Sequence, residues 1–271
     1  MNHYRRIASA VIILPPVILI LLFASYELFA LLVCTVVSLS LHEYFRLLMI
    51  KQEPVGVWLS HVLAVALTGA AYLQGPALMA PVLTLGMILL TAAALWQADV
   101  DTPPFLALMC SLFGILFIGW GLSHLVVLYR LEHGSTSTLL FCMVLWSGDI
   151  AALYVGRSLG RRPMVPTISP GKTWEGALGS LVVCLVVATL GAWLLSLPMT
   201  FYQSLLFGLL ISCAAQIGDL AESLLKRYIG VKDSGNLIPG HGGILDRLDS
   251  FCLAAPAAAY FLIALNALTL R

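Results

Sequence analysis

Residues 77–96 read ALMAPVLTLGMILLTAAALW, a run of twenty residues without a charged side chain. A helix needs about 20 apolar residues to cross the hydrocarbon core of a bilayer. Similar runs recur along the whole chain, which is 61% hydrophobic and 10% charged, whereas soluble domains carry about 25% charged residues. Water cannot solvate a compact particle with so little surface charge. The sequence therefore predicts an all-α, polytopic integral membrane protein.

The apolar runs predict about nine transmembrane helices. They lie at residues 7–24, 27–48, 57–74, 77–96, 104–129, 138–156, 175–196, 201–225 and 249–270. With the N-terminus in the cytoplasm, twelve of the fourteen Lys and Arg residues fall on the cytoplasmic side, as positively charged inner loops require. We expect residues 1–137 to form a scaffold that faces lipid or a second subunit, and residues 138–271 to carry a catalytic site that faces the cytoplasm.

Acidic side chains inside transmembrane helices are costly, which makes each of them a candidate functional residue. Asp149 lies in the sixth predicted span and Asp219 and Glu222 near the end of the eighth. Glu43, near the end of the second, fits a structural polar contact as well as a functional role. On a helix, Asp219, Glu222, Ser223 and Lys226 share one face, which predicts either a salt-bridged seam or the wall of a polar cavity.

The segment after this face alternates acids, bases and glycines. It contains Lys232 and Asp233, then the run Pro239–Asp249, PGHGGILDRLD. Gly242 and Gly243 allow backbone N–H groups to approach a phosphate closely. Asp246 and Asp249 form an i, i+3 pair if the last helix begins there, and carboxylates are usual ligands of Mg²⁺. The segment therefore predicts a site for phosphate groups and a metal ion.

A second polar segment contains Gly171-Lys172-Thr173, which imitates the end of a nucleotide-binding P-loop. Pro166 stands where that motif requires its first glycine, and we expect no strand before it. We therefore reject the P-loop. Lys172 remains a candidate phosphate ligand because it leads into a predicted helix start.

The segment from Ser223 to Asp249 resembles the signature of phosphatidate cytidylyltransferases, also called CDP-diacylglycerol synthases. The matching positions are Ser223, Lys226-Arg227, Lys232-Asp233, Gly235, Pro239, His241-Gly242-Gly243-Ile244 and Asp246-Arg247-Leu248-Asp249. The resemblance extends to Ser169–Gly176, Gly218-Asp219 and Trp146-x-x-Asp149. It implies transfer of a cytidylyl group from CTP to phosphatidic acid, a requirement for Mg²⁺ and a bacterial-type inner (plasma) membrane location. It also implies a homodimer in many members. A second cation such as K⁺ stays open, and no nucleic acid is expected.

On this basis we assign roles to individual side chains as hypotheses. The catalytic residues are Asp219, Asp246, Lys172 and Lys226. The metal ligands are Asp219, Asp246 and Asp249. The substrate-binding residues are Ser223, Arg227, Lys232, Asp233, His241, Gly242, Gly243, Arg247, Asp149 and Glu222.

Two alternatives remain open at the level of sequence. A CTP-dependent lipid kinase would release CDP rather than pyrophosphate. A transporter of anionic solutes would tend to place its charges at the bilayer midplane and to show repeated halves. Here the charges gather toward one face and no repeat is evident.

Overall fold

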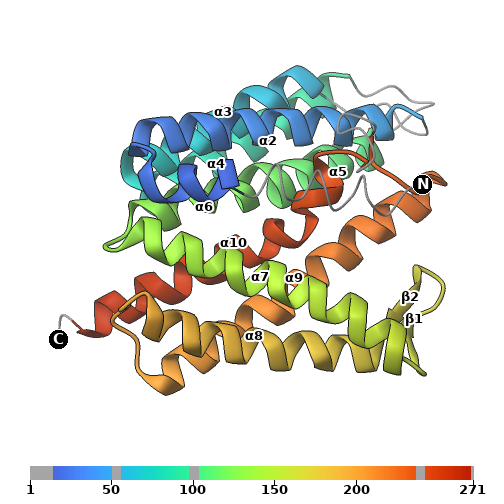
Figure 1. Ribbon diagram of the computed structural model, residues 1–271. Helices are drawn as coiled ribbons and strands as arrows, with labels where there is room; N and C mark the ends of the chain where they lie inside the picture. The colour runs from blue at the N-terminus through green and yellow to red at the C-terminus, as the bar shows by residue number, and fades with distance from the viewer. Residues whose placement is uncertain (1–14, 51–55, 98–103, 236–241, 270–271) are drawn as a thin grey trace. The chain divides into compact units, whose positions relative to one another are not determined.

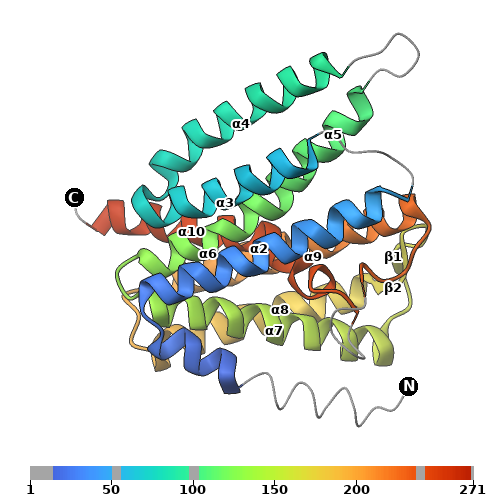
Figure 2. The same cartoon turned by 90° about the horizontal axis from the view of Figure 1, so that it is seen from above.

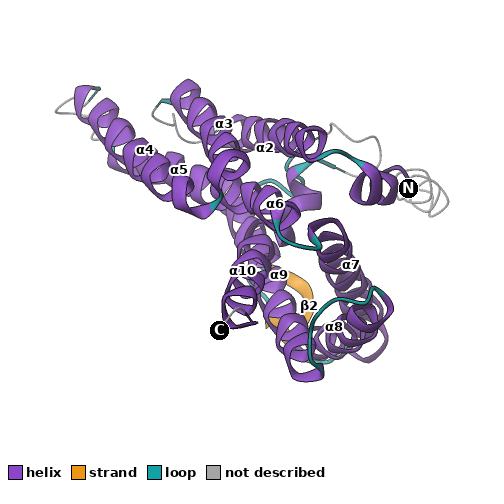
Figure 3. Ribbon diagram, turned by 90° about the vertical axis from the view of Figure 1, so that its left-hand side faces the viewer, coloured by secondary structure: helices purple, strands orange, loops and turns teal. Residues whose placement is uncertain are grey.

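The computed structural model describes residues 15–50, 56–97, 104–235 and 242–269 (Figure 1). These residues are helical apart from one short hairpin, loops and turns (Figure 3). The elements are α2 (Tyr26–Leu48), α3 (Val57–Gln74), α4 (Pro76–Trp96), α5 (Phe105–Gly114), the π-helix η1 (Ile115–Trp120), α6 (Gly121–Arg130), α7 (Gly134–Leu159), β1 (Pro163–Val165), β2 (Ser169–Thr173), α8 (Trp174–Leu194), α9 (Phe201–Ile229) and α10 (Leu245–Thr269).

The described residues contain eight helical segments that are long and apolar enough to cross a membrane. Their ends lie within four residues of the eight predicted spans from 27–48 to 249–270. α5, η1 and α6 together form one of them, Phe105–Arg130. Residues 7–14 of the first predicted span, 7–24, lie outside the described residues, and residues 15–23 are helical. The prediction of a polytopic helical membrane protein is confirmed.

One compact unit comprises residues 1–16, 24–127 and 228–248. In it α3 packs between α2 and α4 (Figure 2). The π-helix η1 contacts both α2 and α3. Tyr44 on α2 donates a hydrogen bond of 2.6 Å from its hydroxyl to the Cys110 carbonyl on α5. This unit includes residues 228–248, which the sequence-based division at residue 137 assigned to the C-terminal part.

The other compact unit comprises residues 17–23, 128–227 and 249–271. α7 and α8 run side by side, joined by the hairpin at one end (Figure 1). Their contact is lined by glycines: a Cβ on Gly148 would lie 2.6 Å from Cys184 Sγ, and one on Gly179 would lie 2.7 Å from Val155. Small residues of this kind let transmembrane helices approach closely, since burial from water does not drive their association.

The hairpin β1–β2 corrects the expectation that no strand precedes Gly171-Lys172-Thr173. β1 pairs with β2 in antiparallel register, and Lys172 lies in β2 itself. Thr173 then caps α8, since its hydroxyl accepts a hydrogen bond from Gly176 N at 3.2 Å. A cap of this kind stabilises a helix by about 1 kcal/mol. The rejection of the P-loop stands, because Lys172 occupies a strand position rather than a glycine-rich loop.

α8 presents an apolar stripe on the surface of its unit. Leu178, Val182, Val186 and Leu190 follow one another at four-residue spacing, and each is at least half exposed. Trp174 at one end of the helix and Trp193 at the other are also exposed. Such a stripe is suited to contact with lipid rather than with water.

Candidate active site

The face predicted on the eighth span forms on α9. Lys226 Nζ lies 2.6 Å from Glu222 Oε2, and Glu222 is almost completely buried. One turn earlier, Ser223 Oγ donates to Asp219 Oδ1 at 3.5 Å. Both contacts join residues four positions apart, which lie next to each other on a helix surface. α9 therefore carries the predicted seam, with one ion pair inside it.

Lys172 meets this face from the hairpin. Its Nζ lies 2.6 Å from Asp219 Oδ2, and both side chains are partly exposed. Because α7, the hairpin and α8 form one packed assembly, β2 fixes the position from which Lys172 extends. The structure thus joins two candidate residues that lie 47 positions apart in the sequence. The ammonium offsets the Asp219 charge, and its nitrogen is buried in this contact.

Two further carboxylates belong to the same cluster. Asp249 on α10 is buried, accepts a hydrogen bond of 2.6 Å from Ser250 N, and interacts electrostatically with Asp219 and Lys226. Asp149 on α7 interacts electrostatically with Asp219 and Lys172. Gly218 lets α9 approach α10 here, since a Cβ on it would lie 2.5 Å from the Asp249 carbonyl oxygen. We refer to Asp149, Lys172, Asp219, Glu222, Ser223, Lys226 and Asp249 as the charged cluster.

In the unit that contains residues 228–248, Asp246 links the two described parts of the signature segment. Its Oδ2 accepts hydrogen bonds from Ser234 N at 2.8 Å and from Gly243 N at 2.9 Å. Gly242 has a φ of +82°, a conformation that side chains rarely adopt. α10 begins at Leu245, so Asp246 and Asp249 are three residues apart on one helix, as predicted.

Glu43 on α2 holds the same segment from the side. Its Oε2 accepts a hydrogen bond from Leu245 N at 2.9 Å and another from Ser234 Oγ at 3.3 Å. The side chain is only 3% exposed. A Cβ on Gly243 would collide with Glu43 Oε2 and Ser234 Oγ, so this position has room only for glycine. Of the two roles left open for Glu43, these contacts establish a structural one.

The remaining predicted residues lie at the surface or outside the described part of the chain. Lys232, Asp233 and Arg247 are exposed. Arg227 is also exposed, but its Nε donates to the Ile168 carbonyl at 2.9 Å and so ties α9 to the hairpin turn. His241 lies outside the described residues. The sequence did not predict the hydrogen bonds made by Arg227 and Glu43. For Glu43, the only signal was an isolated acidic residue in an apolar span.

The carboxylates of the charged cluster are of the kind that bind a hard cation such as Mg²⁺. Among the residues that the structure describes, no group of three His, Cys, Asp or Glu side chains is arranged to hold a metal ion by itself. Mg²⁺ at phosphate sites typically takes one or two carboxylates and completes its octahedron with water and phosphate oxygens. Asp219 and Asp249 fit that pattern.

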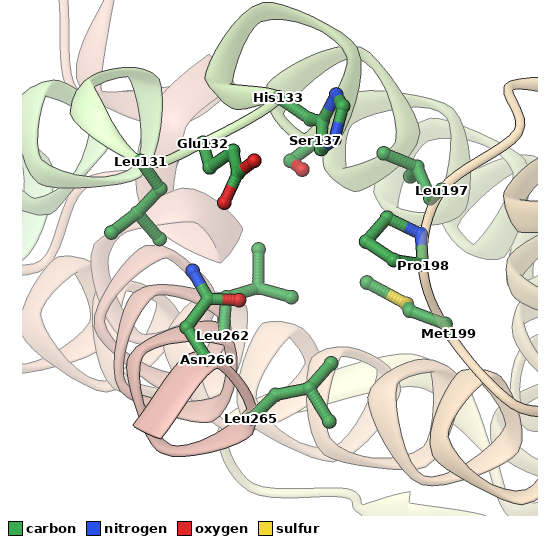
Figure 4. A pocket seen from close by; sticks show the side chains of 10 residues that line it. All are labelled: Leu131, Glu132, His133, Ser137, Leu197, Pro198, Met199, Leu262, Leu265 and Asn266. Carbon is green, nitrogen blue, oxygen red and sulfur yellow. The ribbon is translucent and has the colours of Figure 1, made fainter. Parts of the chain in front are cut away.

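A separate cavity of about 30 Å³ lies in the second unit, at the loops joining α6 to α7 and α8 to α9. Figure 4 shows its lining side chains, among them Glu132, His133, Pro198 and Asn266. The volume accommodates about two water molecules and no nucleotide. None of the predicted site residues lines it.

Fold and site together define a polytopic helical membrane protein that gathers charged side chains on α7, α9, α10 and a short hairpin. The model of the Cytidylyltransferase family matches residues 4–265 of the chain. The chain therefore belongs to the cytidylyltransferase family.

Individual relatives carry a more specific name. The phosphatidate cytidylyltransferase of Haemophilus influenzae is 31% identical over 280 residues, covering 95% of this chain and 97% of that protein. Its counterpart in Bacillus subtilis is 46% identical over 151 residues, which is 55% of this chain and 56% of that protein. The one in Synechocystis is 48% identical over 132 residues, 49% of this chain and 45% of that protein. The chain thus matches only about half the length of the last two.

Proposed function

We propose that the protein transfers the cytidylyl group of CTP to phosphatidate, giving CDP-diacylglycerol and pyrophosphate. The observation that carries this proposal is the charged cluster, in which Lys172 from the hairpin meets Asp219 on α9, a helix long and apolar enough to cross a membrane. The names of the relatives agree with it. We further propose that the site faces the cytoplasm from a bacterial-type inner membrane. A homodimer stays a prediction.

The chemistry requires no general base. A phosphomonoester has its second pKa near ~6, so the lipid phosphate is largely dianionic at neutral pH and serves as the nucleophile directly. One of its oxygens bonds to the α-phosphorus of CTP, the bond from that phosphorus to the bridging oxygen breaks, and pyrophosphate leaves with the electron pair. The barrier is mainly the repulsion between two polyanions, so catalysis consists of positioning and charge neutralisation.

The residues divide this work between them. Lys172 and Lys226 place ammonium groups where phosphates approach, with Arg227, Lys232 and Arg247 as further cationic contacts. Ser223, Asp233, His241 and the Gly242-Gly243 backbone contribute hydrogen bonds. Asp219, Asp246 and Asp249 are the proposed ligands of Mg²⁺, and Asp149 and Glu222 would assist in binding the substrates. A bound Mg²⁺ would offset the negative charge that develops on pyrophosphate.

Purified protein with CTP, Mg²⁺ and phosphatidate tests this function. We expect CDP-diacylglycerol and pyrophosphate in equal amounts, and no turnover after chelation of Mg²⁺ by EDTA. Release of CDP with a phosphorylated lipid would instead identify a kinase. Uptake of an anionic solute into vesicles without CTP would identify a transporter.

Lys172→Ala is expected to weaken substrate binding. It removes the cation that pairs with Asp219 and leaves that carboxylate to repel incoming phosphates. We expect KM for CTP or phosphatidate to rise about tenfold, which corresponds to one charge-assisted contact. Initial rates over a range of both substrates measure this, with Lys172→Arg as the charge-retaining control. Unchanged kinetics in Lys172→Ala would reduce the hairpin to a structural element.

A further inference from the structure

The second unit has an open cavity at the base of the hairpin, separate from the charged cluster. Its volume is about 510 Å³, and it is lined by Arg161, Arg162, Trp174, Glu175 and Leu178. None of these residues belongs to the predicted site. The cavity brings together two guanidinium groups, an indole ring and the first leucine of the exposed α8 stripe.

The backbone fixes this arrangement. Trp174 N donates to the Arg162 carbonyl at 3.0 Å and closes the base of the hairpin. Glu175 Oε2 accepts hydrogen bonds from Arg161 N at 3.0 Å and from Arg162 N at 3.2 Å. Glu175, the one carboxylate among the described lining residues, is therefore engaged by backbone amides, and it also interacts electrostatically with Arg162.

Both guanidinium groups remain available to an anion. Arg161 and Arg162 are exposed, and within the described part of the chain neither forms an ion pair. Two cations against one carboxylate leave the lining with a net positive charge. A guanidinium binds phosphate oxygens in pairs through its planar array of N–H groups.

The length of α8 places this cavity at the level of lipid headgroups. Trp174 and Trp193 are 19 residues apart on one helix, which is about 28 Å at 1.5 Å per residue. That distance is close to the thickness of the hydrocarbon core, and tryptophans are enriched at its two boundaries. From Trp174 the stripe Leu178, Val182, Val186 and Leu190 runs along the helix, where acyl chains would lie.

We infer that Arg161, Arg162 and Trp174 form a docking site for the phosphomonoester headgroup of a diacylglycerol phosphate held in the bilayer. Its acyl chains pack along the α8 stripe. A lipid bound here contacts Trp174, two residues after Lys172, and is held next to the hairpin before it reacts. That the bound lipid is a substrate awaiting reaction rests on the proposed function, whereas binding of the lipid does not.

Quenching of Trp174 fluorescence by brominated acyl chains tests the docking site without CTP or turnover. The protein is placed in phosphatidylcholine nanodiscs containing brominated phosphatidate or brominated phosphatidylcholine, and the Trp174 signal is the difference from Trp174→Phe. We expect phosphatidate to associate at Trp174 at least about fivefold more strongly than phosphatidylcholine, the gain typical of one basic residue near an anionic lipid. Equal association of the two lipids would overturn the inference.

Paired charge variants identify the residues responsible. Arg161→Gln with Arg162→Gln should bring the ratio of association constants to about one. The matched control, Arg130→Gln with Arg157→Gln, removes the same charge at exposed positions outside the cavity and should keep the ratio. An equal loss in the control would show a general effect of net charge and overturn the site.

A salt titration of the unchanged protein covers the case in which the double variant does not fold. Raising the ionic strength from about 0.05 to about 0.5 M should lower the preference for phosphatidate, because salt screens exposed charges. A preference indifferent to salt would contradict the guanidinium contacts. If the preference appears while no CDP-diacylglycerol forms with CTP, the proposed function fails and the docking site stands. If CDP-diacylglycerol forms but phosphatidate is not preferred at Trp174, the docking site fails and the proposed function stands.

Discussion

Asp246→Asn is expected to lower kcat/KM for cytidylyl transfer about a thousandfold, the scale seen when a group that stabilises developing charge is removed. Asparagine keeps one side-chain oxygen, which can replace Oδ2 as the acceptor for Ser234 N and Gly243 N. The variant should therefore insert and fold normally. What it loses is the negative charge proposed to hold Mg²⁺.

The measurement is conversion of phosphatidate by variants matched for yield and melting temperature. Asp246→Ala serves as the structural comparison, because it removes the acceptor as well as the charge and should also lose thermal stability. Glu132→Gln removes an exposed carboxylate elsewhere and should leave both properties unchanged. Near-normal turnover by Asp246→Asn would contradict the assignment of Asp246 as a metal ligand.

Glu43→Ala is expected to destabilise the protein by about 2–5 kcal/mol and to lose most of its activity. The change leaves the Leu245 N–H and the Ser234 hydroxyl without their buried acceptor, and each unsatisfied group costs about 1–3 kcal/mol. The segment that carries Asp246 would then lose its support. Thermal unfolding in detergent measures the first effect, and turnover well below the melting temperature measures the second.

Two variants separate this role from a general effect of removing an acid from α2. Glu43→Gln retains an acceptor oxygen and should recover part of the stability. Glu27→Ala removes an exposed carboxylate from the first turn of the same helix and should cost little. If Glu43→Ala unfolded no earlier than Glu27→Ala, the hydrogen bonds of Glu43 would have no structural importance.

The sequence predicted the helices well because lipid imposes a simple rule. A span of about 20 apolar residues is visible in the chain itself, and residues 57–74 match α3 at both ends. The α9 face was predictable for a related reason. A helix places residues four positions apart side by side, so Glu222 and Lys226 had to be neighbours once α9 formed.

Contacts over long sequence separations were beyond such rules. Glu43 lies 202 residues from Leu245, and nothing in the local pattern pairs them. Lys172 was expected near phosphates, but its partner Asp219 became evident only from the structure. The hairpin was missed because β1 and β2 are only three and five residues long. Prolines also stand at the start of β1 (Pro163), in the turn (Pro166) and within β2 (Pro170).

The spacing of Trp174 and Trp193 also has a consequence for the membranes in which the protein works best. With about 28 Å between its two interfacial anchors, α8 matches a bilayer of ordinary hydrocarbon thickness. Hydrophobic mismatch costs fractions of a kcal/mol per Å, and helix tilt or local deformation of the lipid absorbs it. Because the base of the hairpin is continuous with α8, a change in acyl-chain length would act on the hairpin as well as on the lipid-facing surface.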